Sequence, residues 1–310
     1  MGYGDALGPL WWAWRLDGED DHPSGINAHD VGDRDLYGVW RTTRRRVGAR
    51  QLDALRAGLS ERDTALLVAV GALHVVGTGQ LRRLLFWDLT EQGSVRAAQR
   101  TLARLHHAGL VERLDRRIGG MRPGSSMFLW RLSSAGARIV WPDHNKWRRR
   151  EPGLGHLAHV LDVAEVVVRL HEAARSGACR IIEVQTEPEC WRRFNAPWGD
   201  KRILKPDLRV TVGVEGGEMH RFVEVDRDSE HRPVIDRKLA AYIHAWKDGG
   251  ETYRAGVFPG VLWIVPTARR AEVIAERCCK TAAPAMFEVA TNADIPDALI
   301  AGPRSVWAVA

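Results

Sequence analysis

Apolar side chains recur at helical spacing from Ser60 onward, and they predict three helices in the first half of the chain. Ser60, with Asp63 three residues later, has the pattern of an N-terminal cap for the first helix. The apolar face of that helix consists of Ala65, Leu66, Val68, Ala69 and Leu73. Thr78 is expected to cap a short second helix, and Ser94 to open a third, which Gly109 ends. The apolar positions of the third helix are Val95, Ala98, Leu102 and Leu105.

Two strands are expected after the third helix, at residues 110–114 and 127–132, with a polar tip between them. Three helices followed by a hairpin is the order of a winged helix-turn-helix, in which the third helix enters the major groove of DNA. The candidate DNA contacts are Arg96, Gln99, Arg100 and Arg104 on the third helix and Arg116, Arg117 and Arg122 near the hairpin tip. A winged helix that contacts protein, with solvated arginines, is the alternative.

The second half begins with a strongly periodic helix at residues 156–177. Strands are expected at 180–189, 204–213 and 221–228, followed by a helix at 232–246 with Pro233 in its first turn. A strand at 261–267, a helix at 268–280 and a last strand at 285–291 complete the pattern. The expected domains are an N-terminal arm at 1–50, a winged helix at 51–143, a linker at 144–153 and an α/β (α+β) domain at 154–310.

Composition adds a charge asymmetry to this plan. The chain of 310 residues is 45% hydrophobic and 27% charged, as expected for a soluble protein of two domains. No apolar run is long enough to span a bilayer and no signal peptide is recognisable, so we expect a cytoplasmic protein without membrane contact. Residues 41–150 hold 22 Lys and Arg against 8 Asp and Glu, a balance of +14 within a total of +6. That balance favours a polyanion such as double-stranded DNA as partner.

Three carboxylates lie on two neighbouring strands of the second half. Asp207 follows Pro206 on one strand, and Glu224 and Asp226 are two residues apart on the next, so these two share a face of the sheet. Carboxylates that crowd together repel one another unless a cation lies among them, and Mg²⁺ or Mn²⁺ is the cation we expect. The alternative is that Asp207 caps a turn and the other acids pair with nearby arginines.

A Pro-Asp strand followed by an acid-x-acid strand resembles the PD-(D/E)xK nuclease superfamily. The resemblance implies a restriction-endonuclease-like fold in which Asp207 and Glu224 hold a metal ion, with Asp226 as a third ligand. Asp226 occupies the place of the usual Lys, and Lys238 on the following helix could supply the missing charge. Glu165 on the first helix of this half matches an acid that leans toward the metal, or it is a surface acid. Glu230 and His231 are close enough in sequence to help hold metal or DNA.

The longer string, with PDLRV, EVDRDSE and the segment HVLDVAEV beginning at His159, resembles the replication-relaxation family over roughly residues 60–267. The resemblance implies nicking or binding at an origin on a plasmid or another mobile element. Tyr242 is the nearest candidate for a nicking nucleophile, although core packing is the alternative, and water is the nucleophile we expect. Two functions remain open: a metal-dependent endonuclease or nickase, and a non-catalytic origin-binding or regulatory protein with a nuclease-like platform. The Trp-rich tract at 1–40 hints at a nucleoprotein assembly, and a homodimer is a further option.

Overall fold

The computed structural model describes residues 40–41, 47–119, 126–142, 154–197 and 199–300. The chain divides into two compact units, residues 1–157 and 158–310. Both units combine helices with sheets, so the protein belongs to the mixed α/β class that the sequence predicts. The Trp-rich tract at 1–39 and the expected linker at 144–153 lie outside the described residues.

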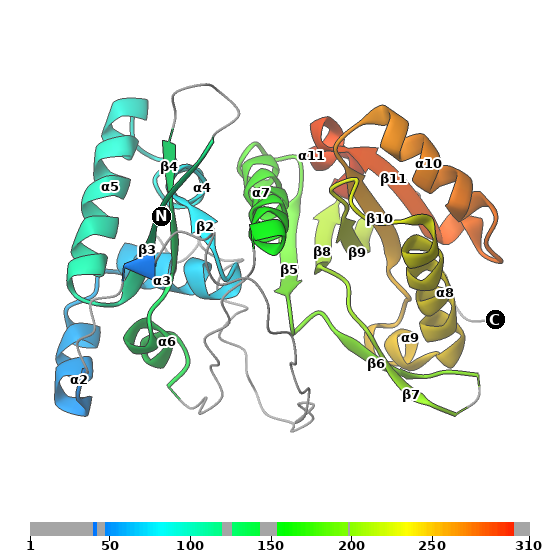
Figure 1. Ribbon diagram of the computed structural model, residues 1–310, viewed down its shortest axis with the longest axis horizontal. Helices are drawn as coiled ribbons and strands as arrows, with labels where there is room; N and C mark the ends of the chain where they lie inside the picture. Colours follow the sequence, from blue (N-terminus) through cyan, green and yellow to red (C-terminus); the bar gives the residue numbers. More distant parts are fainter. Residues whose placement is uncertain (1–39, 42–46, 120–125, 143–153, 198, 301–310) are drawn as a thin grey trace. The chain divides into compact units, whose positions relative to one another are not determined.

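Unit 1 combines helices with an antiparallel sheet (Figure 1). Its helices are α2 (Ala49–Ala57), α3 (Glu61–Ala72), α4 (Thr78–Leu85), α5 (Glu91–His107) and α6 (Ser134–Val140). Its strands are β1 (Trp40–Arg41), β2 (Val76–Gly77), β3 (Val111–Gly119) and β4 (Ser126–Leu132), in the sheet order β1-β3-β4-β2. The predicted succession of three helices and a hairpin is present as α3, α4, α5 and β3–β4. Helices α2 and α6 were not predicted.

The first helix cap is confirmed, and the next two predicted caps are wrong. The Ser60 hydroxyl accepts from the Asp63 N–H at 3.2 Å, and the Asp63 carboxylate accepts from the Ser60 N–H at 3.0 Å. Gly77, not Thr78, is the N-cap of α4, because the Thr78 hydroxyl donates to the Phe128 carbonyl and accepts from the indole of Trp130.

Helix α5 begins earlier than predicted, because Thr90 is its N-cap and its hydroxyl accepts from the Gly93 N–H at 3.3 Å. Ser94 therefore lies inside the helix, where it is buried, and Val95 is 38% exposed rather than part of the core. The other expected apolar positions, Ala98, Leu102 and Leu105, are buried as predicted. Gly109 follows the helix with φ of 76°, the left-handed conformation that glycine adopts without strain.

Unit 2 is built on a five-stranded mixed sheet. Its helices are α7 (Leu154–Arg175), α8 (Arg232–Asp248), α9 (Gly250–Ala255), α10 (Ala268–Cys279) and α11 (Ile295–Ile300), with short 3-10 turns η2 (Pro284–Met286) and η3 (Asn292–Asp294). Its strands are β5 (Arg180–Thr186), β6 (Arg192–Asn195), β7 (Lys201–Leu204), β8 (Leu208–Val214), β9 (Gly217–Val225), β10 (Gly260–Val265) and β11 (Phe287–Thr291). All the predicted helices and strands of this half are present. The β6–β7 hairpin, α9 and α11 are additional.

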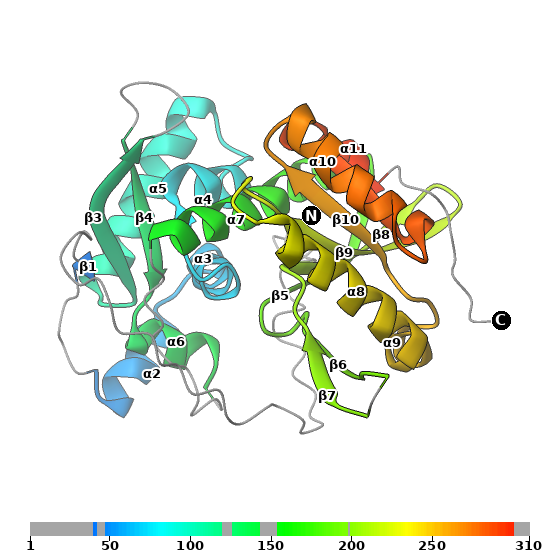
Figure 2. The same cartoon turned by 45° about the vertical axis from the view of Figure 1, so that its right-hand side comes forward.

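The sheet order β11-β10-β9-β8-β5 places the two acid-bearing strands side by side. Strands β8 and β9 form an antiparallel pair, whereas β9, β10 and β11 run parallel to one another. The parallel connections pass through α8 and α10, which cover one face of the sheet, and α7 lies on the other face (Figures 1 and 2). The core under α8 and α10 is centred on Phe222, Tyr242, Trp263 and Ile274.

The membrane prediction and the cysteines can be considered together with this fold. No helix among the described residues is long and apolar enough to cross a membrane. All four cysteines lie in the described part of the chain and are free thiols.

Candidate functional site

Asp207 lies directly before β8 and is fastened to β9 by its backbone and its side chain. Its N–H donates to the Val223 carbonyl at 3.0 Å, and its Oδ2 accepts from the Val225 N–H at 2.7 Å. The second oxygen, Oδ1, lies 2.9 Å from Nε2 of His159 on α7. The carboxylate is therefore held beside residues 223–225 of β9, which include Glu224.

Glu224 is a buried acid whose two oxygens have different partners. Oε2 accepts from the Lys238 ammonium at 2.8 Å, and Oε1 accepts from the Tyr242 hydroxyl at 2.5 Å. Burial raises the pKa of the Glu224 carboxyl to about 7; the Lys238 charge opposes this rise and the Asp207 charge adds to it. Residues 207 and 224 lie on neighbouring parts of the chain's sheet, because the Asp207 N–H and carboxylate bond to residues 223 and 225 on either side of Glu224.

Lys238, on helix α8, contacts two acids, Glu224 and Glu230. Besides Glu224, its ammonium contacts Oε1 of Glu230 at 2.6 Å. Burial lowers the pKa of Lys238, but the charges of Glu224 and Asp207 outweigh burial and raise it. Lys238 is therefore a stable cation. Its place on α8, one helical turn from Tyr242, explains how both residues reach the same carboxylate.

Asp226 does not join the other two carboxylates. Its Oδ2 and Oδ1 accept from Nε and Nη2 of Arg270 on α10 at 2.6 and 3.0 Å, a bidentate pair, and Oδ2 also accepts from the Asp228 N–H at 2.9 Å. Its side chain is 0% exposed. Glu224 and Asp226 do point to one face, the face covered by α8 and α10. Asp226 nevertheless has a different role from Glu224, because its pair with Arg270 anchors α10 to the end of β9.

The first helix of unit 2 contributes His159 rather than Glu165 to this region. Burial lowers the pKa of His159, and the hydrogen bond and charge of Asp207 reverse this, so the net change is upward. The Glu165 carboxylate accepts from Nε of Arg169 one turn along α7, at 3.2 Å. Asp162, on the same broad face, is paired with Arg227. In this structure it is His159 on this helix, and not Glu165, that contacts Asp207.

Within the described residues, no group of three or more His, Cys, Asp and Glu side chains has the geometry of a metal site. Asp207 and Glu224 remain as an adjacent pair, and Mg²⁺ is commonly held by one or two carboxylates, with water and substrate phosphate completing the shell. The donor chemistry of this pair thus fits a hard divalent cation. Asp226 differs from this pair, because its fully buried carboxylate forms a bidentate ion pair with Arg270, which already balances its charge.

In unit 1, the candidate DNA contacts separate into three groups. Arg96, Gln99 and Arg100 are exposed on α5. Arg104 is also exposed, but it pairs with the buried Asp63, whose pKa is lowered because hydrogen bonds from Arg104 and Ser60 outweigh the effect of burial. Arg104 therefore ties α5 to α3. Arg122 and the side chains of Arg116 and Arg117 lie outside the described part of the structure.

Three partners of the acids were missing from the sequence-based site: His159 as partner of Asp207, Tyr242 as partner of Glu224, and Arg270 as partner of Asp226. Tyr242 is fully buried, and burial together with the Glu224 charge raises its pKa well above the usual value. A buried phenol with a raised pKa is a poor nucleophile, which supports core packing over nicking as its role.

The comparisons with known proteins give one family. Residues 67–261 match the replication-relaxation family, a span that includes α4, α5, the β3–β4 hairpin and both acid-bearing strands. No curated protein and no solved structure matches this chain.

Proposed function

Because the chain belongs to the replication-relaxation family, which suggests a role in plasmid replication or relaxation, we propose that it binds duplex DNA through unit 1 and cuts or nicks DNA through unit 2. The observation that carries the catalytic part is the cluster of Asp207, Glu224 and Lys238. These residues come from the start of β8, from β9 and from α8. One or two carboxylates commonly hold Mg²⁺ together with water and substrate phosphate, and an ammonium can balance negative charge on the phosphate.

A Mg²⁺ or Mn²⁺ ion, when bound, would polarise the phosphodiester and lower the pKa of a bound water. Asp207 and Glu224 would hold it, since one oxygen of Asp207 is already fixed by the Val225 N–H and cannot rotate freely. Lys238 remains charged near neutral pH, so it is suited to stabilise negative charge on the phosphate. His159 orients Asp207 from the opposite side.

Unit 1 supports the DNA-binding part of the proposal. Helices α3, α4 and α5 with the β3–β4 hairpin have the order of a winged helix, and α5 presents Arg96, Gln99 and Arg100 to solvent. Arginine and glutamine recognise guanine and adenine edges in the major groove. Arg104 is not among our proposed base contacts, because it is used by Asp63.

A second candidate is a non-catalytic platform, and one observation favours it. Each carboxylate already has a cationic or neutral-donor partner within the protein: His159 for Asp207, Lys238 for Glu224 and Arg270 for Asp226. A network balanced in this way is stable without a metal ion. The platform would still bind plasmid DNA through unit 1.

Nicking of supercoiled plasmid in Mg²⁺ or Mn²⁺ distinguishes the two functions. For the enzyme, Asp207→Asn and Glu224→Gln each reduce the nicking rate by about 100-fold or more, since even second-shell changes at metal sites cost 10–100-fold. Glu276→Gln, an exposed acid on α10, is the matched control and keeps the wild-type rate. Equal nicking by all four proteins would remove the site. Absence of nicking by the wild type, with plasmid binding intact, would establish the platform.

Binding of Mn²⁺ provides a readout independent of cleavage. A ligand at 100 times its Kd stabilises the folded state by about 2.7 kcal/mol. We expect Mn²⁺ to raise the melting temperature of the wild type and of Glu276→Gln but not of Asp207→Asn.

A further inference from the structure

The β6–β7 hairpin, with the residues that flank it, forms a basic ribbon in a unit that is otherwise balanced in charge. Residues 158–310 hold 21 Lys and Arg against 22 Asp and Glu, whereas residues 191–205 hold five cations and one acid. The exposed cations of this basic ribbon (residues 191–205) are Arg193, Lys201, Arg202 and Lys205. Figures 1 and 2 show the two strands projecting from the body of the unit.

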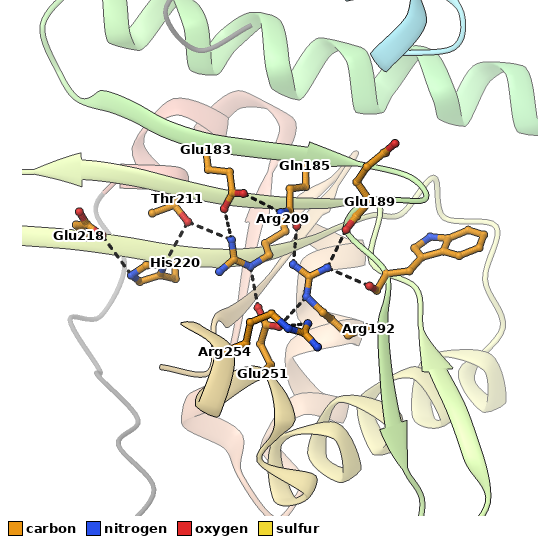
Figure 3. Close-up of polar contacts among 11 residues, drawn as sticks. Glu183, Gln185, Glu189, Arg192, Arg209, Thr211, Glu218, His220, Glu251 and Arg254 are labelled. Carbon is orange, nitrogen blue, oxygen red and sulfur yellow. Dashed lines mark hydrogen bonds and ion pairs between the residues drawn. The ribbon is translucent and has the colours of Figure 1, made fainter. Parts of the chain in front are cut away.

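One face of the ribbon is fixed to the core, while the cations named above remain exposed at the surface. Side chains alternate along β6: Phe194 enters the core cluster with Leu204, and Arg192 is buried. Nε of Arg192 donates to Glu251 on α9 at 2.7 Å, and Glu251 also accepts from Arg209 of β8 at 2.9 Å (Figure 3). Buried pairs of this kind hold one register, which makes the ribbon a fixed projection.

The base of the ribbon adjoins the carboxylate pair. Lys205 is two residues before Asp207, and its ammonium lies 4.4 Å from the centre of the Trp191 ring. The neighbouring thiol of Cys190 donates to the Pro206 carbonyl at 3.0 Å, which joins the two ends of the ribbon next to Asp207. A strand of four residues extends about 13 Å, which equals the rise of about four base pairs along a duplex.

We propose that the basic ribbon is a second nucleic-acid contact, which grips the phosphate backbone beside Asp207 and Glu224. The choice of nucleic acid as partner rests on the proposed function. A two-stranded ribbon fits a DNA groove, and the ribbon contacts phosphates through Lys201, Arg202 and Lys205, independently of base sequence. Its role is to place a backbone segment next to the carboxylates while α5 selects the site.

The test compares two triple variants of the full chain that lose equal charge. One is Lys201→Ala, Arg202→Ala and Lys205→Ala in the ribbon; the control is Lys247→Ala, Arg269→Ala and Lys280→Ala at exposed positions of α8 and α10 and just after α10. Affinity for a random-sequence duplex is measured by fluorescence anisotropy across a salt series in EDTA, where no cleavage occurs. Each phosphate contact contributes about 0.9 to the slope of log K against log salt. We expect the ribbon variant to lose up to about 2.7 of slope and the control to lose none.

Equal slopes for the ribbon variant and the control would overturn the proposal and would leave the ribbon as a surface for a protein partner. The result does not depend on nicking, so it is separable from a failure of the Asp207 and Glu224 site. Thermal melts of both variants show whether the ribbon remains folded. If the triple variant melts early, Lys201→Glu with Lys205→Glu, both at exposed positions, gives the same comparison against Lys247→Glu with Arg269→Glu.

Discussion

The Lys238 ammonium lies 2.8 Å from Oε2 of Glu224, although the two residues are 14 positions apart and belong to α8 and β9. In the pattern that the sequence resembles, a lysine two residues after the acid supplies this charge; here that place holds Asp226, which turns to Arg270. The helix that follows β9 therefore brings a cation to the carboxylate by a different route. The pair Lys238–Glu224 gives the first prediction.

Two substitutions of Lys238 distinguish the effect of its charge from the effect of its side-chain length. We expect Lys238→Met to reduce nicking by about 100-fold, as loss of a charge-stabilising donor does elsewhere, and Lys238→Arg to retain part of the activity. The loss of stability should be smaller than the roughly 3–5 kcal/mol of a fully buried broken pair, because Glu224 with a pKa of about 7 can take up a proton instead. Urea unfolding and plasmid nicking measure the two effects. Lys247→Met, at an exposed position on the same helix, is the control, and identical nicking by the two Met variants would remove Lys238 from the site.

The second prediction concerns Arg270, which we expect to act on stability alone. Arg270→Ala leaves the Asp226 carboxylate buried without its partner, at a cost of about 3–5 kcal/mol. Arg277 lies on the same helix as Arg270 and forms a more exposed pair with Asp236 of α8, so Arg277→Ala should cost less than about 1 kcal/mol. The measurement is urea unfolding of both variants.

The double variant Asp226→Asn with Arg270→Ala tests whether the unpaired Asp226 charge causes the loss of stability in Arg270→Ala. Removing the charge at residue 226 eliminates the uncompensated anion, so the double variant should be more stable than Arg270→Ala alone. Asp226→Asn should also keep Mn²⁺ binding. A loss of Mn²⁺ binding in Asp226→Asn would instead make Asp226 a metal ligand, as the sequence alone suggested.

The sequence predicted those parts of the fold that depend on local periodicity. Alternation along 221–228 and the turn before it placed Glu224 beside the strand that starts near Asp207, because neighbouring strands joined by a short turn usually pair. The Ser60–Asp63 cap was readable for the same reason, since both partners lie within four residues. The β6–β7 hairpin was missed because strands of four residues, with a buried arginine among them, carry too little periodic signal.

The partners of the acids could not be read from the sequence. His159 is 48 residues from Asp207, and Arg270 is 44 residues from Asp226. Such pairs are set by how α7 and α10 pack on the sheet, and several arginines in the chain are equally plausible partners by spacing alone. The start of α5 was misjudged because Ser94 and Thr90 both precede apolar periodic positions, and only the structure shows which hydroxyl accepts a backbone N–H.

The third prediction is a pH dependence that arises from His159. The folded-state pKa of His159 is raised above 6.5, because the effect of Asp207 exceeds that of burial. The folded protein therefore binds this proton more tightly than the unfolded chain, and the pair stabilises the fold fully below pH 6.5 and loses its effect as the pH rises through the folded pKa. Glu224 acts in the same direction: with a folded pKa of about 7 against 4.5, it makes stability fall between those two values.

Difference curves distinguish the two residues. The free energy of unfolding of the wild type minus that of His159→Gln should be largest below pH 6.5, by up to about 1.5 kcal/mol, and should decline above it. The same difference for Glu224→Gln should decline in a lower pH range, as the pH rises from 4.5 to about 7. His107→Gln, at an exposed position at the end of α5, is the matched control. A flat curve for His159→Gln would mean that Asp207 does not hold the imidazolium, and the orienting role assigned to His159 would fail with it.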